Sequence, residues 1–348
     1  MQVKNNITKI LVIQIRAIGD VVLTTPVFSV LRKNFPRAAL HFLTGNDTAS
    51  IVRGLPEVQE VITWPSSFWK YPAFYFRMFT GRYHLVIDYQ CTPGSAFITW
   101  LTRARQRIGW KMQRRQWAYN LHSAANASQE YVSIQKCRSL ELLGIHDLNT
   151  RLRIHWSDAD QQTVQEYFKV SGIDTNRILI NITPKGKRPA RQWLPEKIID
   201  LTDLLTEKFQ AIVFYNGGPG DLEEVKKMAA ACRRPPLVLP LWPLSVFSAF
   251  LAQVDLHFSY DNGPKHLALA AETATLSLFA TDAPVLWNPI DDPEHPYILA
   301  DVPCRLCRLK QCPLMICMKQ IEPEDILQRI EKIPSLQKKL GKIRQVSP

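Results

Sequence analysis

Continuous apolar runs alternate with stretches of helical spacing over most of the chain. The first run, residues 9–15 (KILVIQI), is typical of a parallel strand buried on both faces. Helical spacing follows from Asp20 to Asn34, and shorter apolar runs predict strands at Ala39–Leu43 and His84–Asp88. A Trp- and Arg-rich stretch then predicts irregular structure to about residue 125. The first half therefore predicts one Rossmann-like layer.

A second alternating series begins with a predicted strand at Arg177–Ile182 (RILINI) and ends with one at Thr275–Phe279. Polar turn residues near 170–176 interrupt the pattern and place a domain boundary there, so the predicted domains are residues 1–173 and 174–348. The second domain ends in a basic C-terminal tail. Strands that alternate with helices form doubly wound parallel sheets, so the predicted fold class is α/β with two such domains. Between the two outer strands the pattern predicts helices at Pro195–Lys208, Asp221–Cys232, Leu244–Ala252 and Asp261–Ala271, and strands at Ala211–Tyr215, Pro236–Leu239 and Asp255–Ser259.

Length and charge narrow the range of functions. A chain of 348 residues exceeds the usual size of a single core, which agrees with two domains. The 43 Lys and Arg residues exceed the 31 Asp and Glu residues, which favours phosphate, nucleic acid or an anionic membrane as partner. No nucleic-acid-binding module is recognisable in the sequence. The early apolar run ends at Arg16 and is too short for a secretory signal or a membrane span, so we expect a cytoplasmic protein.

The seven cysteines are an odd number, which argues against a disulfide framework. Four of them lie close together in the sequence, at Cys304, Cys307, Cys312 and Cys317. Thiolates at this spacing could bind zinc or an iron–sulfur cluster, and the alternative is a structural group of reduced thiols. We predict the second case, with no bound metal.

Two loops follow predicted strands and open predicted helices, at the sheet edge where α/β proteins bind ligands. In the first, Gly19 allows a sharp turn, and Asp20 either caps the helix or acts as a general base. The second, Ser259–His266, opens a helix whose free backbone amides suit a diphosphate, although Asn-Gly-Pro also fits an ordinary turn. His266 is either a ligand or a buried histidine with a structural partner.

Two further loops carry candidate nucleotide ligands. The loop Thr183–Trp193 holds four basic residues after a buried strand, and it is either a phosphate site or a solvated basic loop. The turn Gly217–Asp221 lacks the third glycine of the dinucleotide fingerprint. The acidic residue of this turn, Asp221, suits ribose hydroxyl groups better than phosphate.

Aromatic and basic residues are mixed in residues 68–83 (FWKYPAFYFRMFTGRY), a composition that fits a water–lipid boundary or a core-packing helix. A second basic stretch, which begins at Arg103, either binds the phosphates and carboxylates of an anionic acceptor or is a solvated face. Both lie in the half that would hold the acceptor, so we expect peripheral attachment to the cytoplasmic face of the inner membrane. The candidate acceptor-binding residues are Arg103, Arg105, Arg107 and Lys111.

Four ordered motifs resemble those of glycosyltransferase family 9, the heptosyltransferases that build the inner core of lipopolysaccharide. The resemblance extends from about Lys9 to Ile326. The motifs are Ala17–Pro26 (AIGDVVLTTP), Arg191–Pro195 (RQWLP), Gly217–Asp221 (GGPGD) and Asp261–Ala268 (DNGPKHLA).

The resemblance implies a GT-B fold, in which two Rossmann-like domains face each other across a cleft, and an inverting transfer without a metal or other cofactor. It implies ADP-heptose as donor and an anionic glycolipid, Kdo-lipid A or its first heptose, as acceptor. The alternatives are a transferase that uses another nucleotide sugar, and a nucleotide-binding homologue without activity. Asp20 would be the base, and Arg191 would occupy the place of a phosphate-binding lysine. The other predicted donor-binding residues are Thr183, Asp221, Trp242, Asp261, Asn262, Gly263, Pro264 and His266.

The sequence departs from the family pattern at three motif positions. Asn262 replaces threonine, Asp221 replaces glutamate and Arg191 replaces lysine. Each residue retains hydrogen bonding or charge, so the predicted fold and class are unchanged. The identity of the donor is the open point, because arginine is a planar fork rather than a point charge and aspartate has the shorter reach.

Overall fold

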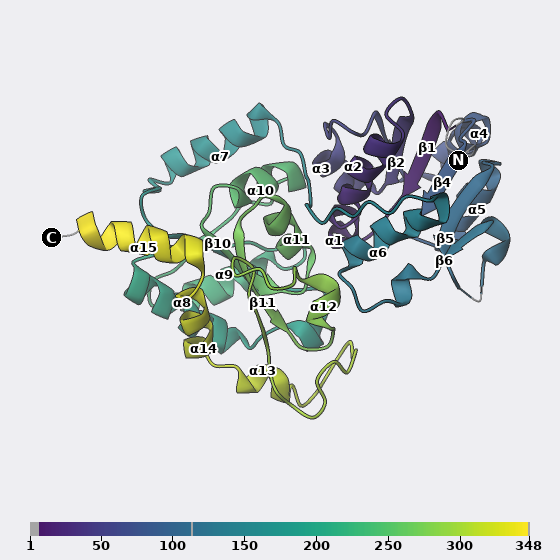
Figure 1. Cartoon of the computed structure of the whole chain (residues 1–348). Helices are drawn as coiled ribbons and strands as arrows, with labels where there is room; N and C mark the ends of the chain where they lie inside the picture. Colours follow the sequence, from purple (N-terminus) through teal and green to yellow (C-terminus); the bar gives the residue numbers. More distant parts are fainter. Residues whose placement is uncertain (1–6, 113, 347–348) are drawn as a thin grey trace. The chain divides into compact units, whose positions relative to one another are not determined.

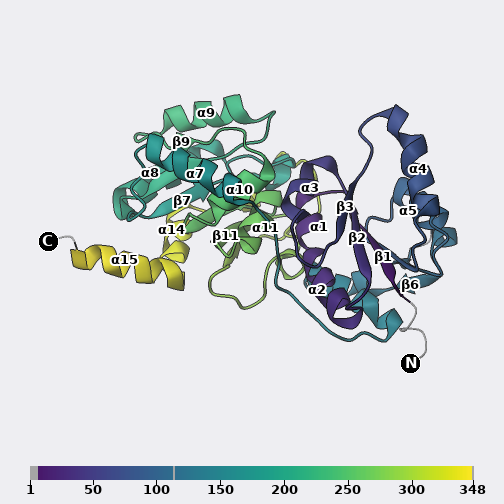
Figure 2. The same cartoon turned by 90° about the horizontal axis from the view of Figure 1, so that it is seen from above.

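The computed structural model describes residues 7–112 and 114–346, and the chain divides into two compact units, Met1–His155 and Trp156–Pro348. Each unit contains one six-stranded sheet with helices on its faces, as Figures 1 and 2 show. The division precedes α7 (Asp158–Val170), which packs against α10 (Leu244–Leu251) of the second unit. It therefore lies earlier in the chain than the boundary predicted near residue 173.

The sheet of the first unit has the strand order β3-β2-β1-β4-β5-β6, and all neighbouring strands are parallel. The order reverses between β1 and β4, which is the point where open α/β sheets bind ligands. The strands are β1 (Lys9–Ile13), β2 (Ala39–Thr44), β3 (Glu60–Thr63), β4 (Leu85–Asp88), β5 (Gln106–Trp110) and β6 (Leu121–Ser123).

Helices cover both faces of this sheet. Figure 2 shows α4 and α5 on one face and α1, α2 and α3 on the other. Phe74 and Met78 of α4 pack on Leu11 and Val86, and Phe28 of α2 meets Phe42 of β2 edge to face on the opposite side. The helices are α1 (Ile18–Val22), α2 (Thr25–Asn34), α3 (Asn46–Val52), α4 (Tyr71–Thr80), α5 (Pro93–Leu101) and α6 (Val132–Arg138), with short 3-10 turns η2 (Phe68–Lys70), η3 (Gln116–Ala118), η4 (Ala125–Ala127) and η5 (Ser139–Leu143).

The second unit repeats the plan with the order β12-β11-β10-β7-β8-β9, which reverses between β10 and β7. Its strands are β7 (Leu179–Ile182), β8 (Ile212–Tyr215), β9 (Leu237–Val238), β10 (Leu256–Tyr260), β11 (Ala274–Phe279) and β12 (Tyr297–Leu299). Its other elements are η6 (Pro189–Arg191), α8 (Pro195–Phe209), α9 (Leu222–Ala231), α11 (Gly263–Ala270), α12 (Pro284–Trp287), α13 (Ile316–Gln320), α14 (Pro323–Ile330) and α15 (Pro334–Val346).

Two expectations for the first unit were wrong. The helix expected from Asp20 to Asn34 is two helices, because Pro26 cannot donate an N–H within a helix and instead lies in the first turn of α2. The stretch expected to be irregular contains α5, β5, η3 and β6. In the second unit, the basic tail forms α15, which Leu336 and a Lys339–Asp255 ion pair of 2.7 Å hold against the core.

Candidate functional site

The turn between β1 and α1 is shaped by side chains of the neighbouring strand connection. The Gln90 carboxamide oxygen accepts the backbone N–H groups of Ile15 at 2.9 Å and Arg16 at 2.7 Å. Asp20 then lies in the first turn of α1, partly exposed, and its carboxylate accepts the Ala17 N–H at 3.3 Å. The predicted capping contact therefore exists, although Asp20 makes it from inside the first turn. This carboxylate sits at the switch point of the sheet, where a general base is also expected.

A buried lysine that the sequence did not single out lies beside this turn. Lys136 of α6 is 3% exposed, and its ammonium group donates to the backbone carbonyl of Asp20 at 2.7 Å. Burial lowers the pKa of Lys136 to about 8, against the attraction of the nearby Asp20 charge. No local pattern reveals this position, because a lysine in a short helix is ordinarily solvated.

The second candidate segment follows β10. Asp261 is the first residue after the strand, Asn262 caps α11 by accepting the Lys265 N–H at 3.1 Å, and Pro264 lies in the first turn. The side-chain amide Nδ2 of Asn262 is buried and has no partner among the described residues. Pro264 has no N–H and the Lys265 N–H is already bound by Asn262, so the Gly263 amide at the positive end of the helix dipole and the Asn262 Nδ2 group are the candidate donors to an anion.

Asp261 is surrounded by cations. Its carboxylate, 8% exposed, accepts from Arg191 at 2.8 Å and from Lys265 at 3.3 Å, and His266 lies 3.8 Å away. Burial alone would raise the pKa of Asp261, but Lys265, His266 and Arg191 hold it well below its usual range. Asp261 is therefore a permanently ionised acceptor, suited to hydroxyl groups rather than to proton transfer.

Arg191 uses both arms of its guanidinium group. Nη1 donates to Asp261, Nε donates to Thr281 at 3.2 Å, and Nη2 forms an ion pair with Asp282. Asp282, in the loop after β11, was missed by the sequence analysis, because an acid in a loop carries no distinguishing signal. A diphosphate that bound Arg191 would compete with two carboxylates for it.

Lys265 is the second buried cation of this site. It is 0% exposed, its ammonium group donates to the Trp287 carbonyl at 2.7 Å, and it lies 4.5 Å from the centroid of the Phe279 ring. Burial lowers its pKa to about 8, with Asp261 acting in the opposite direction. The predicted motif contained Lys265, but the sequence alone gave it no role.

The other predicted donor-binding residues follow neighbouring strands. Because all these strands are parallel, their carboxyl ends meet at one sheet edge. Thr183 follows β7 and donates to Asn216 after β8 at 2.7 Å, and Asp221 precedes α9. Trp242 follows β9, and its ring packs on Tyr167 at 5.1 Å between ring centroids, so it also has a structural role.

The predicted acceptor residues do not lie together. Arg103 and Arg105 are exposed and precede β5, so they lie at the amino edge of the sheet, whereas Asp20 follows the carboxyl end of β1. Arg107 donates to the carbonyls of Ala104 at 2.6 Å and Ala118 at 2.8 Å, which is a structural use of its guanidinium group. Lys111 follows β5, is exposed, and shares the edge of Asp20.

The aromatic segment divides between core and surface. Phe74 and Met78 are buried, while a second set of rings is exposed, with Phe68 at 77% and Trp69 at 87%. Ring contacts join Tyr71 to Tyr75 and continue through α5 to η3. We call the exposed set the aromatic surface; it consists of Phe68, Trp69, Phe76, Phe79, Phe97, Trp100 and Trp117. Within residues 7–112 and 114–346, no helix has the length and apolar character needed to cross a bilayer.

The four C-terminal cysteines are unpaired thiols, two exposed and two partly buried. Burial raises the pKa of Cys317, and its neighbours Cys304, Cys307 and Cys312 add to this effect, so the four thiols share one region. Across the described part of the chain, no three His, Cys, Asp or Glu side chains are arranged to hold a metal ion.

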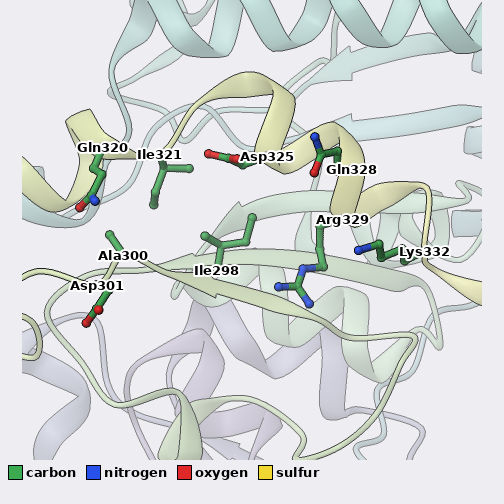
Figure 3. Close-up of a pocket in the computed structure, with 9 residues that line it drawn as sticks. All are labelled: Ile298, Ala300, Asp301, Gln320, Ile321, Asp325, Gln328, Arg329 and Lys332. Atoms are coloured by element: carbon green, nitrogen blue, oxygen red, sulfur yellow. The ribbon is translucent and has the colours of Figure 1, made fainter.

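A cavity of about 400 Å³ lies between β12 and α14 of the second unit, as Figure 3 shows. It contains none of the predicted site residues. The residues that line it are Ile298, Ala300, Asp301, Gln320, Ile321, Asp325, Gln328, Arg329 and Lys332.

Comparison with known proteins identifies the family. Residues 75–317 match the model of glycosyltransferase family 9 (heptosyltransferase). The chain is 24% identical over 289 residues to lipopolysaccharide heptosyltransferase 3 of Escherichia coli, covering 78% of this chain and 83% of that protein.

Solved structures share the fold. A family 9 glycosyltransferase from Veillonella parvula superposes with a TM-score of 0.84 at 18% identity, covering 96% of this chain and 98% of that one. The Escherichia coli heptosyltransferase WaaC, crystallised with ADP-2-deoxy-2-fluoro heptose, gives a TM-score of 0.68 at 18% identity, covering 93% and 99% of the two chains. The predicted α/β fold, a GT-B architecture of two Rossmann-like domains, is confirmed.

Proposed function

Because the chain belongs to glycosyltransferase family 9 and is a glycosyltransferase, we propose that it transfers a heptose from ADP-heptose to the inner core of lipopolysaccharide. The acceptor is Kdo-lipid A or a heptose already attached to it. The observation that carries the proposal is the site around Asp261, where an anion-binding helix end adjoins an ionised carboxylate and two cations. The names and ligand of the relatives supply the sugar and the nucleotide.

The second unit binds the donor in this proposal. The Gly263 backbone amide and the Asn262 side-chain amide bind the diphosphate, and Asp261 accepts hydroxyl groups of the sugar. As the glycosidic bond to the diphosphate breaks, negative charge grows on the leaving nucleotide. Arg191 and Lys265 stabilise that charge, so the transfer requires no metal ion. Thr183 and Asp221 contribute hydrogen bonds from adjacent strand ends, and Trp242 contacts adenine.

The first unit supplies the base and the acceptor site. Asp20 takes the proton of the acceptor hydroxyl while that oxygen attacks the anomeric carbon from the face opposite the diphosphate, which inverts the configuration. Lys111, exposed at the same sheet edge, binds an anionic group of the acceptor. Arg103 and Arg105 lie at the other edge and are assigned to the membrane rather than to the reacting hydroxyl.

Attachment to the cytoplasmic face of the inner membrane is the localisation that fits the aromatic surface. Contiguous exposed apolar patches of this kind mark interaction sites, and aromatic rings favour the boundary between water and lipid. Exposed cations lie beside the rings, including Lys70, Arg77 and Arg82. Arg103 stands 5.6 Å from the centroid of the Phe79 ring. Cations and rings together match an anionic lipid surface.

The proposal is tested by incubating the purified enzyme with ADP- and GDP-sugars and defined core acceptors, with products read by mass spectrometry. We expect a heptosyl adduct on Kdo-lipid A or on its heptosylated form, from ADP-heptose only. Transfer solely from another nucleotide sugar would refute the donor assignment. Binding of ADP without any transfer would instead support a homologue that has lost its activity.

A further inference from the structure

The ammonium group of Lys136 is enclosed in the first unit and fully hydrogen-bonded. It donates to the Asp20 carbonyl at 2.7 Å, to the Thr24 hydroxyl at 2.8 Å and to the Gln14 carboxamide oxygen at 3.2 Å. An ammonium group has three donors, so all of them are used. The ring of Tyr89 lies 5.5 Å from the same nitrogen.

These three acceptors all belong to the segment that carries Asp20. Gln14 follows β1, Asp20 lies in α1, and Thr24 follows α1 and itself donates to the Asp20 carbonyl at 2.7 Å. Lys136, in contrast, comes from α6, 116 residues away in the chain. A buried ammonium group is costly unless it is paired and hydrogen-bonded, so an apolar residue would be the simpler choice for packing alone. The position of the charge therefore points to a role in the turn.

We propose that Lys136 is a positioning residue for Asp20: it fixes the first turn of α1 through its hydrogen bonds to Gln14, Asp20 and Thr24. The inference rests on the proposed function, in which Asp20 is the general base. Lys136 itself exchanges no proton with the acceptor. A base held in place is positioned to accept a proton, and a displacement of about 1 Å can reduce turnover by roughly 10²-fold.

The groups that face Lys136 define its pH dependence. They are Asp20 of α1, Cys137 on its own helix and Tyr89 after β4. Burial raises the pKa of Cys137 to about 11 and raises that of Tyr89 further, so both are neutral where Lys136 titrates. Burial lowers the pKa of Lys136 to about 8. Lys136 is therefore charged below pH 8 and loses its charge as the pH rises through that value.

The test compares the pH profiles of kcat, at saturating donor, for wild type, Lys136→Met and Lys136→Arg. In wild type, kcat should fall as the pH rises through about 8. Lys136→Met keeps the length of the side chain but removes the charge and the donors. We expect a roughly 10- to 10²-fold lower kcat with an unchanged KM for the donor. The fall of kcat above a pH of about 8 should be smaller in Lys136→Met, because the ammonium group that titrates there is absent. Lys136→Arg should restore part of kcat and retain it above that pH, because the guanidinium group stays charged.

Cys137→Ala is the matched control, because Cys137 is the next residue of α6 and is 0% exposed. It should lower the melting temperature while leaving the pH profile of kcat unchanged. Lys265, whose pKa is also about 8, acts on the leaving nucleotide in the proposed function. Because it is present in wild type and in every variant compared, its titration produces no difference between their profiles.

A fall of kcat above a pH of about 8 that is the same in Lys136→Met as in wild type, in an enzyme that Asp20→Asn inactivates, would overturn this inference alone. An active Asp20→Asn enzyme would instead overturn the proposed base. If Lys136→Met fails to fold, Lys136→Arg and wild type decide the matter, since a wild-type kcat that is flat from pH 7 to pH 9 also overturns it.

Discussion

Replacing Asp20 by asparagine separates its two roles, because the structure contains the capping contact that one of them requires. The carboxylate accepts the Ala17 N–H at 3.3 Å, and an asparagine carbonyl oxygen can accept the same bond. Lys136 and Thr24 bind the backbone carbonyl of residue 20, which the substitution leaves intact. The free energy of unfolding should therefore change by less than about 0.5 kcal/mol. Turnover should fall by roughly 10²–10⁴-fold, which is about 2.7–5.4 kcal/mol of activation free energy, since the amide cannot take a proton.

The assay measures kcat by mass spectrometry of the glycolipid product, ADP binding by calorimetry and the melting temperature, each for wild type and variant. Asp47→Asn is the matched control, because Asp47 is an exposed acid in the first turn of α3, the helix that follows the neighbouring strand β2. It should be silent in all three measurements. Near-normal turnover in Asp20→Asn, with its melting temperature unchanged, would show that Asp20 only caps the helix and would direct the search for a base elsewhere.

Three further predictions concern the metal, the membrane and the thiols. Turnover should persist in excess EDTA, and activity that is lost on chelation and restored by magnesium would contradict metal independence. Arg191→Ala should weaken ADP binding by about 10- to 10²-fold through loss of a charge-assisted contact. The protein should bind anionic vesicles and dissociate from them as the salt concentration rises. Trp69→Ser should weaken this binding, whereas Val170→Ser, at an exposed apolar residue of the second unit, should not. Absence from vesicles at every salt concentration would refute attachment. Metal analysis of protein purified without added metal should find well under one zinc or iron per chain, whereas a stoichiometric amount would make the cysteines a metal site, namely Cys304, Cys307, Cys312 and Cys317.

Much of the fold could be predicted because its central strands are locally distinctive. β1, β7 and β10 are buried along nearly their whole length, and most of their residues are apolar, which is the pattern expected of central parallel strands. β5 (Gln106–Trp110) could not be recognised in this way, since it is partly exposed and holds Gln106 and Arg107. Its arginine stays in the sheet because Ala104 and Ala118 supply carbonyl groups, which are tertiary partners that a short window does not contain. The break at Pro26, by contrast, was visible in the sequence, because proline lacks the N–H that a continuous helix needs.

The residues of the candidate site also fall into a group that local pattern reveals and a group that depends on tertiary contacts. Asp20, Asp261 and Asn262 follow strands and open helices, so local pattern was enough to select them. The partners that set their charge come from elsewhere in the chain. Arg191 illustrates the difference. A lysine would offer one charged nitrogen, whereas the guanidinium group of arginine offers a second NH2 group, and Asp282 from the loop after β11 binds it here. A second acid therefore accompanies the arginine in this chain. If Arg191 and Asp282 act as a pair, Asp282→Asn should free one nitrogen of the Arg191 guanidinium group and tighten ADP binding. In an Arg191→Lys enzyme, the same change at Asp282 should leave ADP binding unaltered. Weaker ADP binding in Asp282→Asn would instead mean that Asp282 holds Arg191 in its binding position.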